Sequence, residues 1–212
     1  MMPIKQLIFE GVEADDLIAL CVNLPIYKGW QKLILSNDKD FYQLLNEETV
    51  IYRPTVKRYM TITNVLNEFH IHPTNFTLAR AIAGDASDNL PGAPGVGLKT
   101  VVKYFPQVSS SVPATLPSIF DACKKTESKI KAYKSILDSK SKVELNYKMM
   151  QLYAPIVSPT VKRVTRNILK PTELTFNMTA MRTQMTIDGF GAYSWWILES
   201  SMKRLVRESK NT

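Results

Sequence analysis

Seven acidic residues in three short motifs have the clearest capacity for chemistry in this sequence. They are Glu13, Asp15 and Asp16, then Asp38 and Asp40, and finally Asp85 and Asp88. If the motifs converge, each like-charge pair at about 4 Å costs on the order of 4 kcal/mol at an effective dielectric of 20, so positive charge must lie among them. All-oxygen ligation without His or Cys favours Mg²⁺ or Mn²⁺. Two such ions roughly 4 Å apart can activate a water and stabilise the leaving oxygen of a phosphodiester, which predicts hydrolysis of nucleic acid.

The expected secondary structure gives each acidic motif a definite position. Asp15 and Asp16 are predicted to open a helix, whose N-terminal dipole tolerates negative charge. Asp38 is expected to follow a buried strand, at the carboxyl end where α/β sheets bind their ligands. Asp85 and Asp88 are three residues apart, which places them on one face of a predicted helical turn. Each motif alone is also an ordinary helix start or turn, so only the combination favours a metal site.

A glycine-rich segment, residues 90–100 (LPGAPGVGLKT), follows the third motif and lies between two predicted helices. Glycine lets a backbone approach a phosphate closely, and the N–H groups that open the second helix form an anion site. This pattern fits a helix-hairpin-helix, which holds a duplex backbone without sequence preference, although a plain turn between helices is the simpler alternative. We expect DNA contacts from Gly92, Gly95, Val96, Gly97, Lys99 and Thr100.

The elements around the motifs indicate an α/β layer followed by a helical region. The expected elements are a helix over 14–24, a strand over 32–35, a short helix over 40–45, strands over 49–53 and 57–62, and a helix over 64–69 capped by Thr63. Later we expect a surface loop over 107–117, a lysine-rich helix, and a terminal helix packed by Trp195 and Trp196. Residues 1–74 should form the α/β part, and residues 75–212 a helical domain with the hairpin at 81–105 and basic C-terminal helices.

The composition favours a polyanionic partner, because the 212 residues carry a formal charge of +8. Eight lysines between positions 124 and 148 suggest that the C-terminal half binds nucleic acid and that the acidic half before it is catalytic. A single lysine, however, often does no more than form part of a solvent-exposed helix face. Cys21 and Cys123 lie far apart in sequence and match neither a metal knuckle nor a CxxC redox pair, which predicts buried or idle free thiols. No apolar run approaches the roughly 18 residues of a membrane span. We therefore expect no membrane contact and a cytoplasmic location, the host cytoplasm if a phage encodes the protein.

Four blocks carry a resemblance to a known family: residues 11–16 (GVEADD), 36–40 (SNDKD), 84–92 (GDASDNLPG) and 94–100 (PGVGLKT). In order and spacing they resemble the signature of the 5′→3′ exonuclease and flap endonuclease family, which includes the 5′-nuclease domain of bacterial DNA polymerase I and bacteriophage exonucleases with RNase H activity. The resemblance implies a partial PIN-like sheet flanked by helices, followed by a helical helix-hairpin-helix domain. It also implies that the seven acids are direct or water-mediated ligands of two divalent ions, that the hairpin holds phosphate, and that K⁺ binds at the hairpin.

The sequence departs from the family pattern before Glu13. Family members carry there a strand with a metal-binding Asp, a basic helical arch and a second metal-binding Asp, whereas only a dozen residues precede Glu13 in this sequence. We therefore expect a second polypeptide to supply the N-terminal half, and the pair to hydrolyse DNA, or an RNA primer, at 5′ ends or flaps. Two alternatives remain: a non-catalytic structure-specific DNA-binding module derived from this family and, less favoured, a ribonuclease of the related small acidic-site fold.

Overall fold

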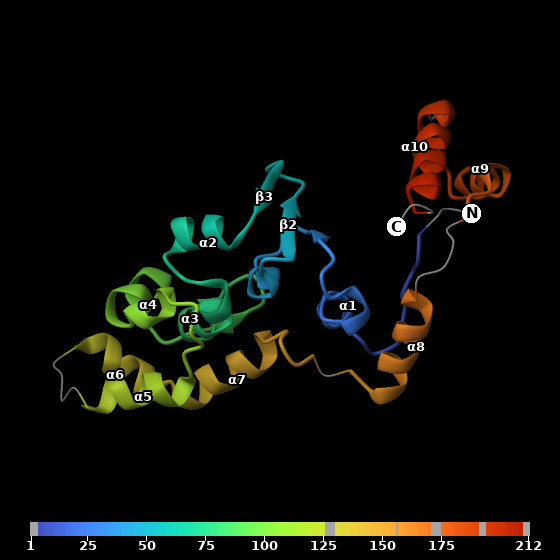
Figure 1. The fold of residues 1–212 in the computed structure, drawn as a ribbon. Helices are drawn as coiled ribbons and strands as arrows, with labels where there is room; N and C mark the ends of the chain where they lie inside the picture. Colours follow the sequence, from blue (N-terminus) through green and yellow to red (C-terminus); the bar gives the residue numbers. More distant parts are fainter. Residues whose placement is uncertain (1–3, 126–129, 156, 171–174, 191–193, 210–212) are drawn as a thin grey trace. The chain divides into compact units, whose positions relative to one another are not determined.

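The computed structural model describes residues 4–125, 130–155, 157–170, 175–190 and 194–209, and Figure 1 shows their elements. The chain divides into two compact units, one formed by Val12–Val157 and the other by Met1–Gly11 together with Ser158–Thr212. The expected domain boundary after residue 74 falls inside the larger unit and stays a prediction. Within the described residues, no helix is long and apolar enough to cross a membrane.

The larger unit contains a three-stranded sheet of mixed direction. Strand β1 (Lys32–Leu35) runs parallel to β2 (Thr49–Arg53), and β3 (Arg58–Met60) pairs antiparallel with β2. The register places Ile34 opposite Ile51, and Ile51 opposite Met60. These three side chains are buried on one face of the sheet, which fixes the register because a slip by one residue would turn them to the other face. The predicted strand at 32–35 is confirmed.

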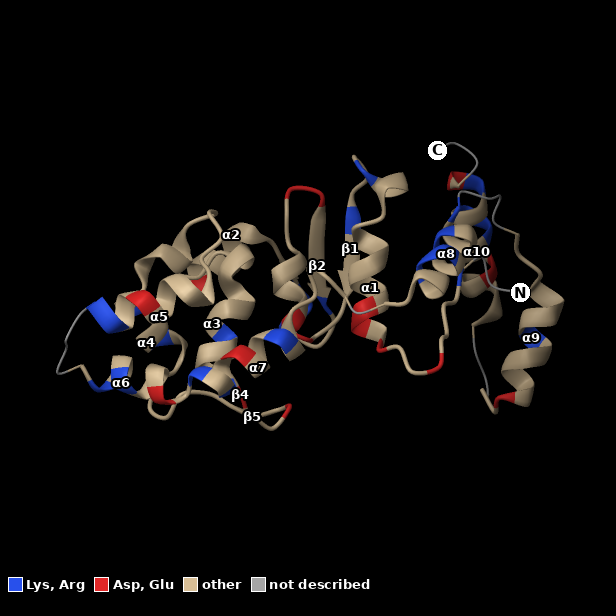
Figure 2. Cartoon of the chain, turned by 90° about the horizontal axis from the view of Figure 1, so that it is seen from below, with Lys and Arg blue, Asp and Glu red and all other residues tan. Residues whose placement is uncertain are grey.

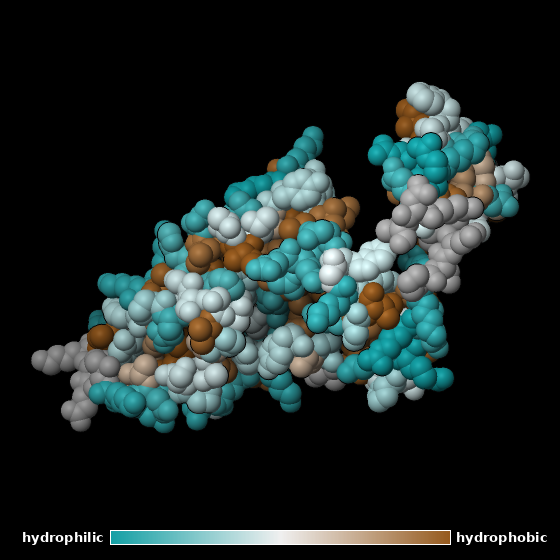
Figure 3. Space-filling model, viewed as in Figure 1, coloured by the Kyte–Doolittle hydropathy of each residue, from teal (hydrophilic) through white to brown (hydrophobic). Residues whose placement is uncertain are grey.

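The opposite face of the sheet carries apolar side chains that are open to solvent. Leu33, Leu35 and Tyr59 are exposed, and the rings of Tyr52 and Tyr59 pack at a tilted angle with centroids 5.0 Å apart. Figure 3 shows hydrophobic surface in the region of this sheet, between hydrophilic patches. In the sheet that the structure describes, β1 is an edge strand with β2 as its neighbour. An apolar face beside an open edge is a surface that favours association.

Helices and short 3₁₀ turns complete the larger unit. The helices that precede the basic region are α1 (Ala14–Val22), α2 (Ile62–Phe69), α3 (Phe76–Ala83) and α4 (Leu98–Tyr104). The basic region forms α5 (Leu116–Lys125), α6 (Lys131–Asp138) and α7 (Lys140–Met150). The 3₁₀ turns are η1 (Pro25–Tyr27), η2 (Asp40–Leu44), η3 (Pro73–Asn75) and η4 (Pro106–Ser109). The lysine-rich stretch therefore contains three helices rather than one.

Helix α3 lies at the centre of the core. It packs against α4 and α7, and six of its eight side chains are buried. Phe76 at its start forms an aromatic cluster with Tyr42 and Phe69, with ring centroids 5.2 to 5.9 Å apart. The buried Asn75 donates to carbonyl oxygens of the following loop, including those of Ser110 and Val112, and so holds the expected surface loop against the core.

Two sequence expectations about helices are wrong. Helix α2 begins at Ile62 with Thr61 as its cap, because Asn64 at the third helical position completes a reciprocal capping box with Thr61 rather than with Thr63. The C-terminal region forms α8 (Pro159–Leu169), α9 (Met178–Ile187) and α10 (Trp195–Glu208) instead of one terminal helix with packed aromatics. Trp196 is 73% exposed, whereas Trp195 lies under the guanidinium of Arg182.

Candidate metal centre

The first two acidic motifs occupy the predicted positions. Helix α1 begins at Ala14, so Asp15 and Asp16 lie in its first turn, where unsatisfied N–H groups tolerate negative charge. Asp38 follows β1, and its Oδ1 accepts a hydrogen bond of 2.8 Å from the backbone N–H of Asp40. This local bond closes the turn that leads from β1 into η2, which begins at Asp40. The expected helix start and strand exit are both confirmed.

The third motif is not a helical turn. Asp85 ends strand β4 (Gly84–Asp85), a tight turn contains Asp88, and the chain returns as β5 (Leu90–Pro91). The helical expectation fails because Gly84 has a left-handed φ of +82° that ends α3, and Asn89 also has a positive φ. The Asp85 carboxylate accepts a bond of 2.9 Å from the backbone N–H of Ser87, which stabilises the turn.

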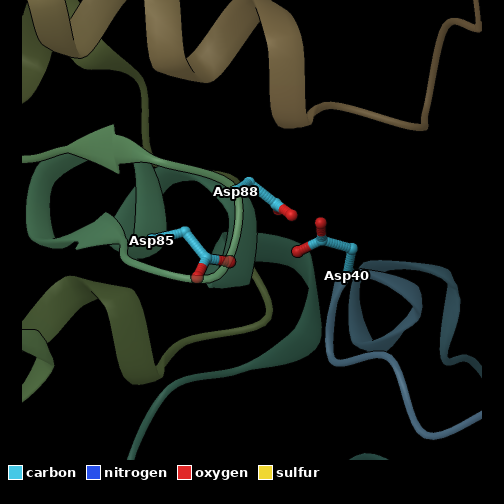
Figure 4. A group of neighbouring side chains, drawn as sticks. All are labelled: Asp40, Asp85 and Asp88. Atoms are coloured by element: carbon cyan, nitrogen blue, oxygen red, sulfur yellow. The ribbon is translucent and has the colours of Figure 1, made fainter.

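The three motifs converge, as the sequence predicts. One cavity of about 630 Å³ is lined by six of the seven acids: Glu13, Asp15, Asp16, Asp38, Asp40 and Asp88. The seventh, Asp85, joins Asp40 and Asp88 in a group in which each residue offers one carboxylate oxygen, and these three oxygens lie within 4.8 Å of one another. Figure 4 shows Asp88 and Asp40 pointing toward each other from the β4–β5 turn and from η2. An oxygen-only group of this spacing fits a hard divalent cation, which binds carboxylates at about 2.0–2.6 Å.

Arg80 is a site residue that the sequence analysis missed. Its guanidinium forms an ion pair of 2.8 Å with Asp40 and a second ion pair with Asp85, and all three side chains are largely buried. Arg80 therefore fixes the positions of two carboxylates and neutralises part of their charge. The signal was available, because Arg80 is the only charged residue in the apolar helix α3. A buried lone charge needs a partner of opposite sign.

Burial and neighbouring charges disfavour the ionised forms of Asp40 and Asp15. Burial raises the pKa of Asp40 from 3.8 to about 6, Arg80 opposes this shift, and the charges of Asp38, Asp88 and Asp15 add to it. Burial also raises the pKa of Asp15, with further contributions led by Asp38 and Glu13. The site thus has an excess of negative charge that a bound cation would offset.

A prediction for stability follows from the raised pKa of Asp40. The folded state holds the proton of the Asp40 carboxyl group more tightly than the unfolded state does. The contribution of Asp40 to the free energy of unfolding therefore falls as pH rises from 3.8 to about 6. In EDTA, wild type should therefore lose more thermal stability over this window than Asp40→Asn. Mg²⁺ should restore more stability at about pH 7 than at about pH 5, because it binds the ionised form. Thermal denaturation by circular dichroism measures both effects, and an equal Mg²⁺ shift at both pH values would contradict the prediction.

Two side chains fasten α7 to the elements that carry the acids. The buried amide of Asn146 donates to the carbonyl oxygens of Ala81 at 3.2 Å and Pro91 at 3.1 Å, and so joins α7 to α3 and β5. Gln43 of η2 donates to Met150 O at 2.9 Å and accepts from Leu152 N at 2.7 Å. These bonds hold the end of α7 beside both the second and the third acidic motif.

The residues of the glycine hairpin have distinct structural roles. A Cβ on Gly92 would lie 2.2 Å from the carbonyl carbon of Ala83, so this glycine is required by the close approach of two backbones. The Val96 side chain is buried, and its N–H donates to Ala93 O at 3.0 Å, which gives Val96 a packing role. Gly97 precedes α4, which Lys99 and Thr100 help to open. Phosphate binding by the hairpin stays a prediction.

Comparisons with known proteins agree with this geometry. Residues 1–70 match the family model described as the 5′-3′ exonuclease, N-terminal resolvase-like domain. The 5′-3′ exonuclease of Buchnera aphidicola subsp. Schizaphis graminum is 35% identical over 107 residues, which are 50% of this chain and 37% of the relative. That of Aquifex aeolicus is 31% identical over 146 residues, 69% of this chain and 47% of the relative. The chain thus spans less than half the length of these curated relatives.

Solved structures give the same class of fold. A T5 5′-exonuclease mutant superposes with a TM-score of 0.65 at 22% identity, covering 76% of this chain and 67% of that chain. A bacteriophage T5 flap endonuclease, solved as a pseudo-enzyme-product complex with DNA and metal ions, gives a TM-score of 0.63 at 21% identity, covering 76% and 60%. The fold is therefore the mixed α/β fold of the 5′-exonucleases, as expected. In sequence, the chain is similar to members of the 5′→3′ exonuclease family.

Proposed function

We propose that this chain provides the metal-binding and DNA-binding part of a divalent-metal-dependent 5′→3′ exonuclease or flap endonuclease. The observation that carries the proposal is the convergence of three distant acidic motifs, six acids on one cavity and the seventh beside them. Such a density of carboxylates is unfavourable without cations, and oxygen-only ligands select Mg²⁺ or Mn²⁺. Its family relatives, by name 5′-3′ exonucleases and DNA polymerase I, support the same chemistry.

The roles proposed for the residues follow from their positions. Asp40, Asp85 and Asp88 would hold one ion, while Glu13, Asp15, Asp16 and Asp38 would hold the other directly or through water. When bound, two such ions supply an activated water and stabilisation of the leaving oxygen. Arg80 would keep Asp40 and Asp85 in place and offset part of their negative charge.

We propose that the substrate is DNA with a 5′ end or flap, or an RNA primer. The hairpin next to Asp88 supplies a turn of fixed backbone shape, and Lys99 adds a positive charge to the helix that follows it. A K⁺ ion at the hairpin belongs to the same proposal. The solved relative in complex with DNA and metal ions supports this choice of substrate.

We also propose that a second polypeptide completes the nuclease. The open β1 edge and the exposed apolar face with Leu33, Leu35 and Tyr59 provide a surface on which further strands and helices can pack. The experiment is to incubate the chain with a labelled 5′-flap substrate and Mg²⁺, alone and with a polypeptide carrying the N-terminal half of a relative. Cleavage that disappears in EDTA is expected from the pair. An uncut substrate in every mixture would contradict the proposed function.

The proposed hairpin contact makes a prediction about salt dependence. Lys99→Ala should weaken binding to duplexes of any sequence about equally, and the slope of log K against log salt should shrink by about 1, because one phosphate contact is lost. Fluorescence anisotropy in Ca²⁺ at several salt concentrations measures the slope. Lys28→Ala, which removes the same charge outside the hairpin, should leave the slope nearly unchanged. Equal slopes for the two variants would exclude Lys99 as a specific contact.

A further inference from the structure

Helix α10 of the smaller unit has an inward face that is defined by burial. Partly buried side chains recur every three or four residues along this helix: Trp195, Leu198, Met202 and Val206. This spacing places them on one side of the helix. Trp195 also lies under the guanidinium of Arg182 of α9, which is 5.4 Å from the ring centroid. The side of α10 that faces its own unit is therefore known.

The outward side of α10 carries a tryptophan between polar and cationic side chains. Four exposed residues follow one another at spacings of four, three and four, which places them in one row: Trp196, Ser200, Lys203 and Arg207. The indole of Trp196 is 73% exposed, although it is flat, rigid and largely apolar. A planar apolar surface in one row with two cations suits a ligand that is itself planar and carries negative charge.

The charge of the C-terminal segment indicates the class of ligand. Residues 158–212 contain nine Lys or Arg and only four Asp or Glu, so most of the chain's formal charge of +8 lies in this segment. Helix α8 adds two exposed cations three residues apart, Arg163 and Arg166. Figure 2 shows segments of Lys and Arg on both α8 and α10. Charge complementarity therefore favours a polyanion as the ligand of this unit.

The distribution of apolar side chains on α10 selects among polyanions. Ile197 and Leu205 are exposed, but Ser201, Arg204 and Glu208 share their side of the helix. A helix that lies in a membrane surface needs a continuous apolar face, which this side of α10 lacks. Single-stranded nucleic acid requires less, because proteins bind it by stacking single bases on aromatic side chains and by pairing phosphates with Lys or Arg.

We propose that the outward row of α10 is a separate binding site for single-stranded nucleic acid. An unpaired base stacks on the indole of Trp196, and Lys203 and Arg207 pair with the phosphates on either side of this base. Lys203 also pairs with Glu199 at 2.7 Å, but an exposed ion pair of this kind contributes little and leaves Lys203 able to contact a phosphate. The site lies in the smaller unit, whereas the acidic cavity and the hairpin consist of residues of the larger unit.

The stacking role of Trp196 is tested with the full chain and a labelled oligothymidylate in EDTA, where no cleavage occurs. In fluorescence anisotropy, Trp196→Ala should raise the Kd about tenfold, the effect of one lost stack between a base and an aromatic ring. Trp196→Phe should recover much of the affinity, because a phenyl ring still stacks. Trp30→Ala, which removes a 45% exposed tryptophan from the larger unit, should bind like wild type. An unchanged Kd in Trp196→Ala, or an equal loss in Trp30→Ala, would overturn the inference.

The preference for single strands and the phosphate contacts have separate readouts. Trp196→Ala should leave the Kd for a blunt-ended duplex nearly unchanged, because the faces of paired bases are already stacked. Arg207→Ala should reduce the salt slope for the oligothymidylate by about 0.7, the value for one phosphate contact. Arg204→Ala, which removes the same charge from another side of α10, where it pairs with Glu208 at 2.7 Å, should leave the slope nearly unchanged. Equal slopes for the two variants would refute the phosphate contact of Arg207.

Anionic lipid vesicles provide the test against a membrane surface. If Trp196→Ala lost binding to phosphatidylserine vesicles but kept its affinity for the oligothymidylate, the outward row would be a lipid contact and the inference would be wrong. We expect the opposite dependence. The site does not require the proposed nuclease function, and the two fail differently: an uncut flap substrate in Mg²⁺ would leave the effect of Trp196→Ala in EDTA unchanged.

Discussion

Asp40→Asn should abolish most of the cleavage activity while leaving DNA binding intact. The substitution keeps the shape of the side chain but removes the charge that faces Asp88 in the cluster and pairs with Arg80. Loss of an ion that stabilises developing charge costs several kcal/mol, which corresponds to a rate reduction on the order of a thousandfold. Single-turnover cleavage of a 5′-flap substrate in Mg²⁺, with the completing polypeptide present, measures the rate, and anisotropy in Ca²⁺ measures binding.

The matched control is Asp121→Asn, which removes an exposed carboxylate on α5 outside the acidic cavity. It should cleave at the wild-type rate. Asp40→Asn also separates the nuclease from the alternative of a non-catalytic DNA-binding module, because a module would show no activity to lose. A wild-type cleavage rate in Asp40→Asn would remove this carboxylate from the catalytic site.

Gly92→Ala should destabilise the larger unit strongly. A Cβ at this position would lie 2.2 Å from the carbonyl carbon of Ala83 and 2.4 Å from the nitrogen of Gly84, and both neighbours are backbone atoms that cannot rotate away. The α3 end and the β5 strand must therefore separate, which breaks packing around the hairpin and costs about 2–4 kcal/mol. Chemical denaturation followed by circular dichroism measures the free energy of unfolding.

Gly97→Ala is the matched control for this loss of stability. Gly97 has an extended backbone with φ of −98°, and nothing lies within 4 Å of the position of an added Cβ. Its free energy of unfolding should stay within about 0.5 kcal/mol of wild type. If Gly92→Ala were as stable as Gly97→Ala, the close backbone contact between α3 and β5 would not exist in solution.

The site could be predicted from the sequence largely because its acids lie beside strong local signals. Apolar spacing and Pro25 define α1 closely enough to place Asp15 and Asp16 in its first turn, and the short apolar run at residues 32–35 identifies β1. The position of Asp38 then follows from the direction of the strand. In each case one periodic segment determines where the next carboxylate must lie.

The third motif shows where local patterns are insufficient. A spacing of three residues fits a helical turn as well as a tight hairpin, and the choice is made by Gly84 with its positive φ and by the close approach of Gly92. That approach is a contact between segments, which periodicity does not report. For the same reason the partners of Arg80 were not predicted, since they depend on how α3 lies beside η2 and β4.

Metal binding at the cluster formed by Asp40, Asp85 and Asp88 is tested most directly by crystallography with Mn²⁺. Crystals of the chain soaked in Mn²⁺ and measured near the Mn absorption edge should show an anomalous peak among these three carboxylates, and Asp88→Asn crystals should show a much weaker one. A wild-type map without any anomalous peak in the acidic cavity would contradict metal binding by these carboxylates, and with it the proposed nuclease function.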